Sequence, residues 1–420
     1  MQRILLIPIL LMAALWGMAA DIRFPASSIS PELLKGANVV KRMERAVFHV
    51  VNEGETIYRR EFALTILNEA GAEHAGLVEF YDKFQQVRSI EGALYDANGV
   101  LLKKLKQKEI LDLGASDDNN LADDNRKKTH RFYHKTYPYT IYYEVETRSG
   151  NTLFFPVWMP QEDECFAVDQ SSFTIISPAG NPVRYRVFNY TGEPEVSSLK
   201  GKSSMTWQVK DLVALKRQFA SPPWSSLTTT IMFAPGRFQI GNYKGDMNSW
   251  NGLGQFIYAL KKGRTQLPAH VEQKIKELLE GVESDKEKIS ILYQYLQKHT
   301  RYISIQLGLG GWQPFEASFV AEKGWGDCKA LTNYMSSLLQ VAGIASFEAL
   351  VKAGRNQHPV IEDFPSQQFN HVILCVPLQK DTVWLECTSQ ILAAGYLGEF
   401  TSNRKALLIG ENGATLVSTP

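Results

Sequence analysis

A cysteine that follows a glycine turn and opens an apolar helix has the clearest chemical potential in this sequence. Cys328 comes directly after Gly326 and Asp327, and the Asp327 carboxylate is suited to accept hydrogen bonds from the free amides of a first helical turn. A thiol at a helix N-terminus faces the positive end of the helix dipole, which favours the thiolate, and the same amides can hold an oxyanion. The pattern predicts an activated nucleophile, although a cysteine within a helix is more often a small buried residue.

The residues after this cysteine predict the helix that carries it. Apolar side chains recur at three- and four-residue steps and the run stops at a glycine, in the order Leu331, Met335, Leu338, Leu339, Ala342 and Gly343. We therefore expect one buried stripe and a left-handed C-terminal glycine.

A nucleophilic thiol needs a base and an orienting group, and two later strands offer both. His371 begins the apolar run 370–376, and Glu386 lies near the end of the run 383–388 after a short turn. In an antiparallel hairpin whose paired residue numbers have an odd sum, His371 and Glu386 share one face, and we expect that face to point at the cysteine helix. The same parity places Cys375 beside them and Cys387 on the other face, which disfavours a disulfide between these two cysteines.

The elements that must position these groups change character along the chain. Short alternating strands from residue 46 predict a β-sandwich-like region, after a helical or irregular stretch at 21–45. Helices are predicted near 250–262, 268–280 and 284–300, the last with a capping box from Ser284 to Glu287. Further strands are predicted near 345–351 and 406–409. The fold class is therefore α+β, with residues 21–245 as a β-rich domain and 246–420 as a second domain.

The N-terminal segment, the net charge and one polar loop indicate where the protein is located and which partners it has. Residues 1–20 are a positively started apolar run ending in small residues, which predicts a cleaved signal peptide without a lipid-anchoring cysteine; a short membrane anchor is the alternative. We expect a periplasmic or secreted protein with no transmembrane segment after cleavage. A formal net charge of +1 argues against a nucleic-acid partner. The polar loop 115–128 fits no standard calcium loop, and we predict a solvated loop, no metal site and no cofactor.

The motifs around the three candidate residues resemble the bacterial transglutaminase-like superfamily. The resemblance rests on Gly326-Asp327-Cys328-Lys329, Asn370-His371-Val372 and Trp384-Leu385-Glu386-Cys387-Thr388, and extends back through Arg301-Tyr302-Ile303 and Trp312-Gln313-Pro314. The preceding region is similar to an N-terminal β-rich domain of unknown function that accompanies such cores. The acid is commonly Asp in this family, whereas this chain has Glu386, and many relatives continue into a further small β domain beyond the point where this sequence stops.

The resemblance implies a papain-like α+β core that performs cysteine-dependent acyl transfer at carboxamide or peptide bonds. Cys328 would attack, His371 would move the proton, and Glu386 would orient the imidazole. Gln306, Trp312 and Gln313 are candidates for an oxyanion or substrate donor beside the Cys328 amide. A protease or amidase would pass the acyl group to water and a transglutaminase to an amine. The substrate would be a protein, a peptide or a cell-envelope polymer. The alternative is a catalytically inactive module that binds protein or glycan.

Overall fold

The computed structural model describes residues 23–115, 120–355 and 357–420. The predicted signal peptide, residues 1–20, and residues 116–119 of the polar loop lie outside these ranges. With 39% strand and 22% helix the chain is a strand-rich mixed structure, which confirms the α+β class at that level. None of the helices in the described ranges is long and apolar enough to cross a membrane.

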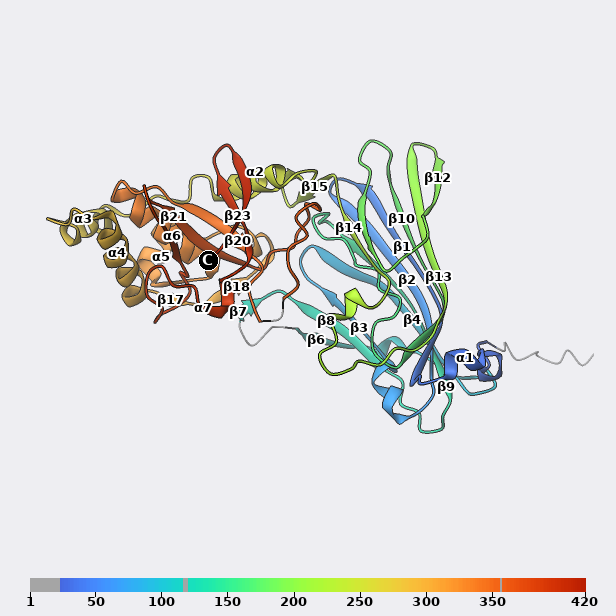
Figure 1. The fold of residues 1–420 in the computed structure, drawn as a ribbon. Helices are drawn as coiled ribbons and strands as arrows, with labels where there is room; N and C mark the ends of the chain where they lie inside the picture. The colour runs from blue at the N-terminus through green and yellow to red at the C-terminus, as the bar shows by residue number, and fades with distance from the viewer. Residues whose placement is uncertain (1–22, 116–119, 356) are drawn as a thin grey trace, which may run out of the picture.

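The amino-terminal half is built almost wholly from strands (Figure 1). After helix α1 (Pro31–Leu34) these are β1 (Val39–Asn52), β2 (Glu55–Ile66), β3 (Gly76–Tyr81), β4 (Gln85–Tyr95), β5 (Leu101–Lys104), β6 (Leu111–Gly114), β7 (Asn120–Asp123), β8 (Arg126–Arg131), β9 (Tyr139–Ser149), β10 (Phe166–Pro178), β11 (Arg184–Phe188), β12 (Glu195–Leu199), β13 (Lys202–Leu212), β14 (Thr230–Ala234), β15 (Arg237–Ile240) and β16 (Tyr243–Asp246). Eight of them form one large sheet in the order β12-β13-β10-β1-β2-β9-β4-β5, in which β1 and β10 run parallel. Strands β3, β8 and β6 form a smaller sheet.

The prediction of helical or irregular structure up to residue 45 is wrong, because β1 already begins at Val39. Charged residues interrupt the apolar pattern in the first half of β1, so the pattern did not predict a strand there. Lys41 is only 1% exposed, and its ammonium is 3.1 Å from a Glu44 oxygen and 2.7 Å from a Glu162 oxygen. Paired charges can be buried in a sheet where isolated ones cannot.

The carboxyl-terminal half packs helices against a second sheet. Its elements are α2 (Trp250–Lys261), α3 (Ala269–Leu278), α4 (Asp285–His299), β17 (Arg301–Tyr302), β18 (Ser304–Gln306), α5 (Ala317–Lys323), β19 (Trp325–Gly326), α6 (Cys328–Val341), β20 (Phe347–Val351), β21 (His371–Pro377), β22 (Thr382–Leu385), α7 (Gly398–Thr401), β23 (Lys405–Gly410) and β24 (Gly413–Ser418). The sheet order is β22-β21-β20-β23-β24. Helix α4 begins at Asp285 without a side-chain cap from Ser284, so the predicted capping box is wrong although the helix is present.

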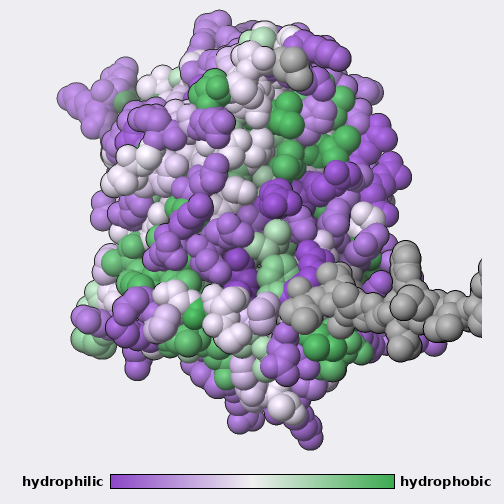
Figure 2. All heavy atoms as spheres, turned by 90° about the vertical axis from the view of Figure 1, so that its right-hand side faces the viewer, coloured by the Kyte–Doolittle hydropathy of each residue, from purple (hydrophilic) through white to green (hydrophobic). Residues whose placement is uncertain are grey.

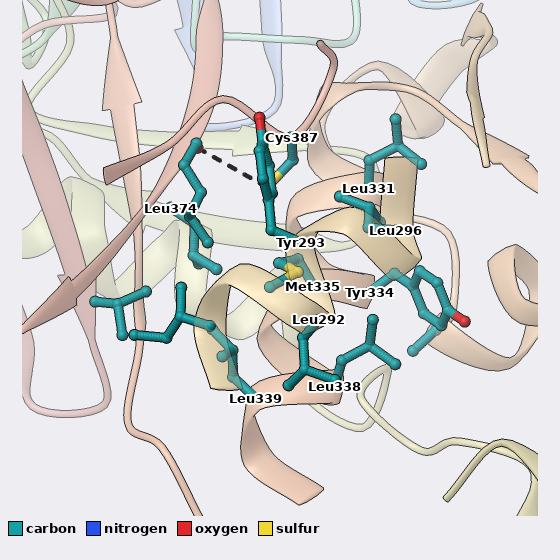
Figure 3. Close-up of a cluster of buried hydrophobic side chains, with 14 of the residues drawn as sticks. Leu292, Tyr293, Leu296, Leu331, Tyr334, Met335, Leu338, Leu339, Leu374 and Cys387 are labelled. Atoms are coloured by element: carbon teal, nitrogen blue, oxygen red, sulfur yellow. Dashed lines mark hydrogen bonds between the residues drawn. The ribbon is translucent and has the colours of Figure 1, made fainter. Parts of the chain in front are cut away.

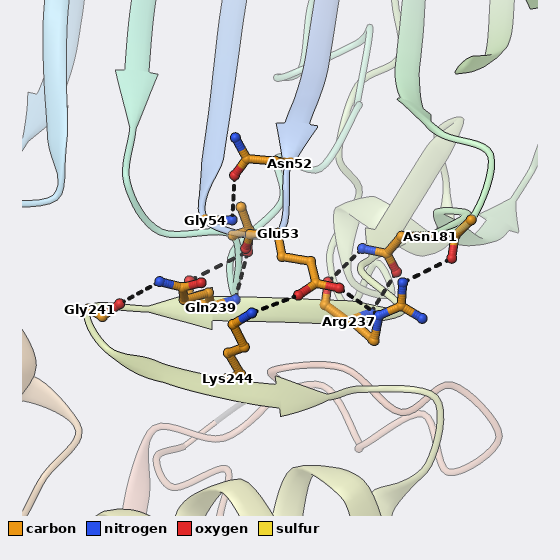
Figure 4. Close-up of polar contacts among 10 residues, drawn as sticks. Asn52, Glu53, Gly54, Asn181, Arg237, Gln239, Gly241 and Lys244 are labelled. Atoms are coloured by element: carbon orange, nitrogen blue, oxygen red, sulfur yellow. Dashed lines mark hydrogen bonds and ion pairs between the residues drawn. The ribbon is translucent and has the colours of Figure 1, made fainter. Parts of the chain in front are cut away.

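Within the amino-terminal half, the turn between β1 and β2 lies over the β15–β16 hairpin, where Glu53 forms ion pairs with Arg237 at 2.6 Å and Lys244 at 3.5 Å (Figure 4). The two halves are joined where β7 pairs in parallel with β18 and the Asp124 carboxylate accepts from the Gly308 amide. The second Asp124 oxygen accepts from the Lys83 amide of the amino-terminal half. Seen from the side of the large sheet, polar side chains cover most of the surface and apolar ones are scattered among them (Figure 2).

Candidate active site

The turn before α6 places Cys328 as the sequence predicts. One Asp327 carboxylate oxygen accepts from the Ala330 amide at 2.9 Å, which confirms the N-terminal cap. A Cβ on Gly326 would lie 2.8 Å from the Ala330 Cβ, so the close approach of turn and helix requires glycine. Gly343 has a φ of +73°, which confirms the left-handed stop. Cys328 is therefore the first residue of a helix whose start and end are both fixed locally.

The apolar stripe of α6 holds this helix against the second sheet (Figure 3). The stripe consists of Leu331, Met335, Leu338 and Leu339. It packs against residues of α4, of β21 and of the segment just after β22, which are Leu292, Tyr293, Leu296, Leu374 and Cys387. Burying a side chain of this size contributes about 1.5–3 kcal/mol. The thiol is thus positioned by a rigid core and not by a loop.

The β21–β22 hairpin brings His371 and Glu386 together. Leu374 pairs with Leu385 and Cys375 with Trp384, so paired residue numbers have an odd sum, as the same-face prediction requires. His371 Nε2 lies 3.0 Å from each Glu386 carboxylate oxygen. Because a carboxylate only accepts hydrogen bonds, Nε2 carries the hydrogen and Nδ1 is left for the thiol. The Cys328 side chain lies close enough to His371 to raise the pKa of the imidazole.

The face of this pair differs from the prediction. Side chains that pack on α6 come from the alternate positions of β21, such as Leu374 and Val376, whereas His371 belongs to the set that faces away from α6. The imidazole nevertheless reaches Cys328 because His371 is the first residue of β21 and lies beside the N-terminus of α6. His371 therefore lies beside the N-terminus of α6 and does not pack along the side of the helix.

The cysteines behave as the parity argument predicts. All four are free thiols. Cys375 packs with Trp384 on one face of the hairpin, and Cys387 packs with Leu374 on the other.

The Glu386 carboxylate is held from several sides. Thr388 donates to Oε1 through its hydroxyl at 2.6 Å and its amide at 3.2 Å, and the Thr401 hydroxyl donates to Oε2 at 3.4 Å. The Tyr293 hydroxyl donates to the Glu386 main-chain carbonyl at 2.7 Å. These contacts fix the longer side chain that replaces the Asp expected from the family resemblance, so the extra methylene does not leave the carboxylate free to move.

Burial and the neighbouring polar groups have opposite effects on the pKa of His371 and also on the pKa of Glu386. Burial by itself would lower the pKa of His371, but hydrogen bonds and charge from Cys328 and Glu386 outweigh it and raise the pKa to about 10. Burial would raise the pKa of Glu386, yet the His371 and Thr388 contacts lower it. The arrangement therefore favours an imidazolium beside an ionised Glu386 carboxylate.

A cavity of about 990 Å³ opens at Cys328 and His371 and is lined by both halves of the chain. The amino-terminal half contributes side chains from its large sheet and from the loop after β9, including Tyr58 and Phe154. Phe154 packs against Trp312 with ring centroids 5.3 Å apart. A cavity of this size accommodates several residues of a polymer.

The three candidate donors have different placements. Gln306 lines the cavity, but its amide donates to the Ser304 hydroxyl at 3.0 Å and to Asp327 at 3.3 Å. Trp312 also lines the cavity. Gln313 donates to the Tyr243 hydroxyl and the Leu260 carbonyl and is not part of the cavity lining.

Several residues of the site were not found from the sequence. Thr388 lies two residues after Glu386, a spacing at which a threonine often bonds a neighbouring acid, and this signal was available. Thr401 carried no such signal, and Tyr302 stood in the Arg301-Tyr302-Ile303 segment of the family resemblance without being assigned to the site. Tyr302 lines the cavity, and burial together with the nearby charge of Cys328 raises the pKa of its phenol. Among the described residues, no three His, Cys, Asp or Glu side chains gather to hold a metal ion.

Comparisons with known proteins found a family model that matches part of the amino-terminal half and solved structures that align with most of this chain. The model of a domain of unknown function that has a solved structure, DUF3857, matches residues 52–216. A putative protease from Parabacteroides distasonis has a similar fold, with a TM-score of 0.65 over 91% of this chain and 72% of that chain at 14% identity. A putative cysteine protease from Cytophaga hutchinsonii aligns over 90% of this chain and 88% of that chain at 7% identity, with a TM-score of only 0.26. The sequence matches no curated protein.

Proposed function

We propose that this protein is an exported cysteine-dependent acyl-transfer enzyme that cleaves peptide or carboxamide bonds, with Cys328 as nucleophile, His371 as acid and base, and Glu386 as orienting group. The observation that carries the proposal is the position of His371, whose imidazole lies close enough to Cys328 for that side chain to raise its pKa and bonds the buried Glu386 carboxylate at 3.0 Å. Cys328 and His371 lie at the N-terminus of α6 and line a cavity large enough for several residues of a polymer. The fold of residues 246–420 is proposed to be transglutaminase-like.

The proposed reaction balances through one covalent intermediate. The Cys328 thiolate attacks the substrate carbonyl carbon, and the charge moves to the carbonyl oxygen. The tetrahedral intermediate collapses as His371 donates its proton to the leaving amine, which departs and leaves a thioester. Water then attacks the thioester while His371 takes a proton from it, and the carboxylic acid product leaves with Cys328 restored. Glu386 remains ionised and keeps the ring oriented.

The oxyanion would be held by the Cys328 main-chain amide and one side-chain donor. The Gln306 amide is engaged with Ser304 and Asp327, and Gln313 is directed away from the cavity. Trp312, which lines the cavity, is therefore the proposed second donor. Water is the proposed acyl acceptor because it is the acceptor always present in a periplasmic or secreted setting.

The test measures thiol activation and acylation on the mature protein. We expect iodoacetamide at about pH 6 to label Cys328 faster than a cysteine in an unstructured peptide, because an activated thiolate reacts below the ordinary thiol pKa. We also expect p-nitrophenyl acetate to form a thioester at Cys328, seen by mass spectrometry. Labelling no faster than the peptide, together with no thioester, would refute the proposal and favour a binding module.

A further inference from the structure

The cavity lining includes a buried pair of opposite charges that the proposed reaction does not use. Glu348 lies in β20, the central strand of the second sheet, and is 6% exposed. Lys261 ends α2, and its ammonium nitrogen is 3.0 Å from the Glu348 Oε1 atom. Both residues line the same cavity as Cys328. The pair is electrically neutral as a whole but strongly dipolar.

Two acceptor atoms of residues that line the cavity also lack a hydrogen-bond donor. Glu348 Oε1 is buried and has no hydrogen-bond partner apart from its ion pair with Lys261. Gln367 lines the cavity as well, and its Oε1 atom is likewise buried without a partner. Buried polar atoms are nearly always paired in folded proteins, and an unpaired one costs about 1–3 kcal/mol. Two such acceptors among the residues that line one cavity indicate that a ligand supplies N–H groups there.

The charge pair is separate from the point of attack. Val351 of β20 pairs with His371, whereas Glu348 pairs with Leu374. Three residues along a strand span roughly 10 Å. A substrate whose carbonyl carbon is held at Cys328 can reach Glu348 only with a different part of its chain, such as the side chain of a neighbouring residue.

We propose that Glu348 and Lys261 form a subsite for an uncharged substrate side chain that ends in a carboxamide, a glutamine or asparagine other than the residue attacked. The amide N–H group would donate to Glu348 and the amide oxygen would accept from Lys261. An ammonium group would meet Lys261, a carboxylate would meet Glu348, and an apolar tip would leave both charges unpaired. The inference rests on the proposed function only in assuming a peptide-like substrate.

Binding to a Cys328→Ala protein tests the subsite without turnover. The probes are fluorescently labelled N-acetyl pentapeptide amides of alanine in which one residue, at each position in turn, is Gln, Glu, Lys or Met. We expect the Gln peptide to bind at least 10-fold more tightly than the other three at one position. Equal binding of the Gln and Met peptides at every position, or no binding of any peptide at 1 mM, would overturn the inference.

Charge variants in the same Cys328→Ala background give a sharper result. Lys261→Met leaves the negative charge alone and should move the preference to the Lys peptide, while Glu348→Gln should move it to the Glu peptide. Reversing both charges, with Glu348→Lys and Lys261→Glu, keeps a dipolar pair and should keep the Gln preference. Circular dichroism melting identifies any variant that fails to fold. An unchanged preference in folded single variants would mean that the pair only anchors α2.

The outcome is separable from that of the proposed function. Peptide binding by Cys328→Ala does not require catalysis, whereas iodoacetamide labelling of Cys328 does not require the subsite. Rapid labelling without a Gln preference would remove the subsite and leave the enzyme. A Gln preference with an unreactive thiol would support a binding module that uses the same pair.

Discussion

Cys328 and the two hairpin cysteines lie in the same half of the chain and all three are buried, yet their polar surroundings differ. Cys328 opens a capped helix, lines a cavity and lies close enough to the His371 imidazole to raise its pKa. Cys375 and Cys387 point into apolar clusters on opposite faces of the hairpin. Burial raises the pKa of Cys375 to about 11, and burial, with the charge of Glu386, raises the pKa of Cys387 well above its ordinary value. A thiol becomes a candidate nucleophile through its neighbours and not through its residue type.

The largest expected effect comes from replacing Cys328 by alanine and comparing it with the same replacement at a hairpin cysteine. Cys328→Ala should lower the rate of p-nitrophenyl acetate turnover by at least about 10³-fold, because the attacking atom is lost. The matched variant Cys375→Ala should change that rate by less than about 3-fold and lower the free energy of unfolding by about 1 kcal/mol. Comparable losses of activity in both variants would erase the distinction between the two sites.

Removing the carboxylate tests whether the imidazole makes Cys328 different. Glu386→Gln should lower the acylation rate by roughly 10²–10³-fold, since the ring loses its orienting anion. Glu316→Gln, an exposed acid in an ion pair with Arg264 at 3.8 Å, serves as the control and should have no measurable effect. A Glu386→Gln variant with wild-type acylation would show that His371 does not depend on Glu386.

The pH dependence of His371 follows from the same contacts. Because its pKa in the folded protein is about 10, its imidazole resonances in NMR should stay those of the charged ring above about pH 8. The charged ring contributes stability that is complete below the unfolded pKa of about 6.5 and is lost as the pH rises toward the folded value. Glu386→Gln should lower the His371 pKa by at least about one unit. A wild-type ring that titrates near 6.5 would contradict the ion-paired description.

The smallest expected effect concerns the helix start. Asp327→Asn retains a capping oxygen but removes the charge that pairs with Lys329, so the free energy of unfolding should fall by about 1 kcal/mol in denaturant titration. Ser249→Ala removes a comparable cap on α2, where the hydroxyl accepts from the Gly252 amide at 3.0 Å, and should cost about as much. Only the Asp327 variant should also change the alkylation rate of Cys328. Equal alkylation rates in both would make Asp327 a cap and nothing more.

Short-range patterns in the sequence were enough for much of the site. The cap at Asp327, the stripe of α6 and the stop at Gly343 depend on neighbours within a few residues, and the structure confirms each of them. The shared face of His371 and Glu386 also followed from strand alternation, because a two-residue shift of register preserves it. The same kind of reasoning failed at β1, where buried charges are stabilised by partners more than a hundred residues away.

The tertiary structure alone decided which face of the hairpin carries the base and what surrounds the thiol. Strand alternation predicts that His371 and Glu386 share a face of the hairpin. The packing of α6 on the opposite face leaves His371 close to the helix only at its N-terminus. The wall that Phe154 adds to the cavity and the meeting of Glu348 with Lys261 join residues about 90 or more positions apart in the sequence. Such contacts depend on how whole sheets and helices pack, and no local pattern encodes them.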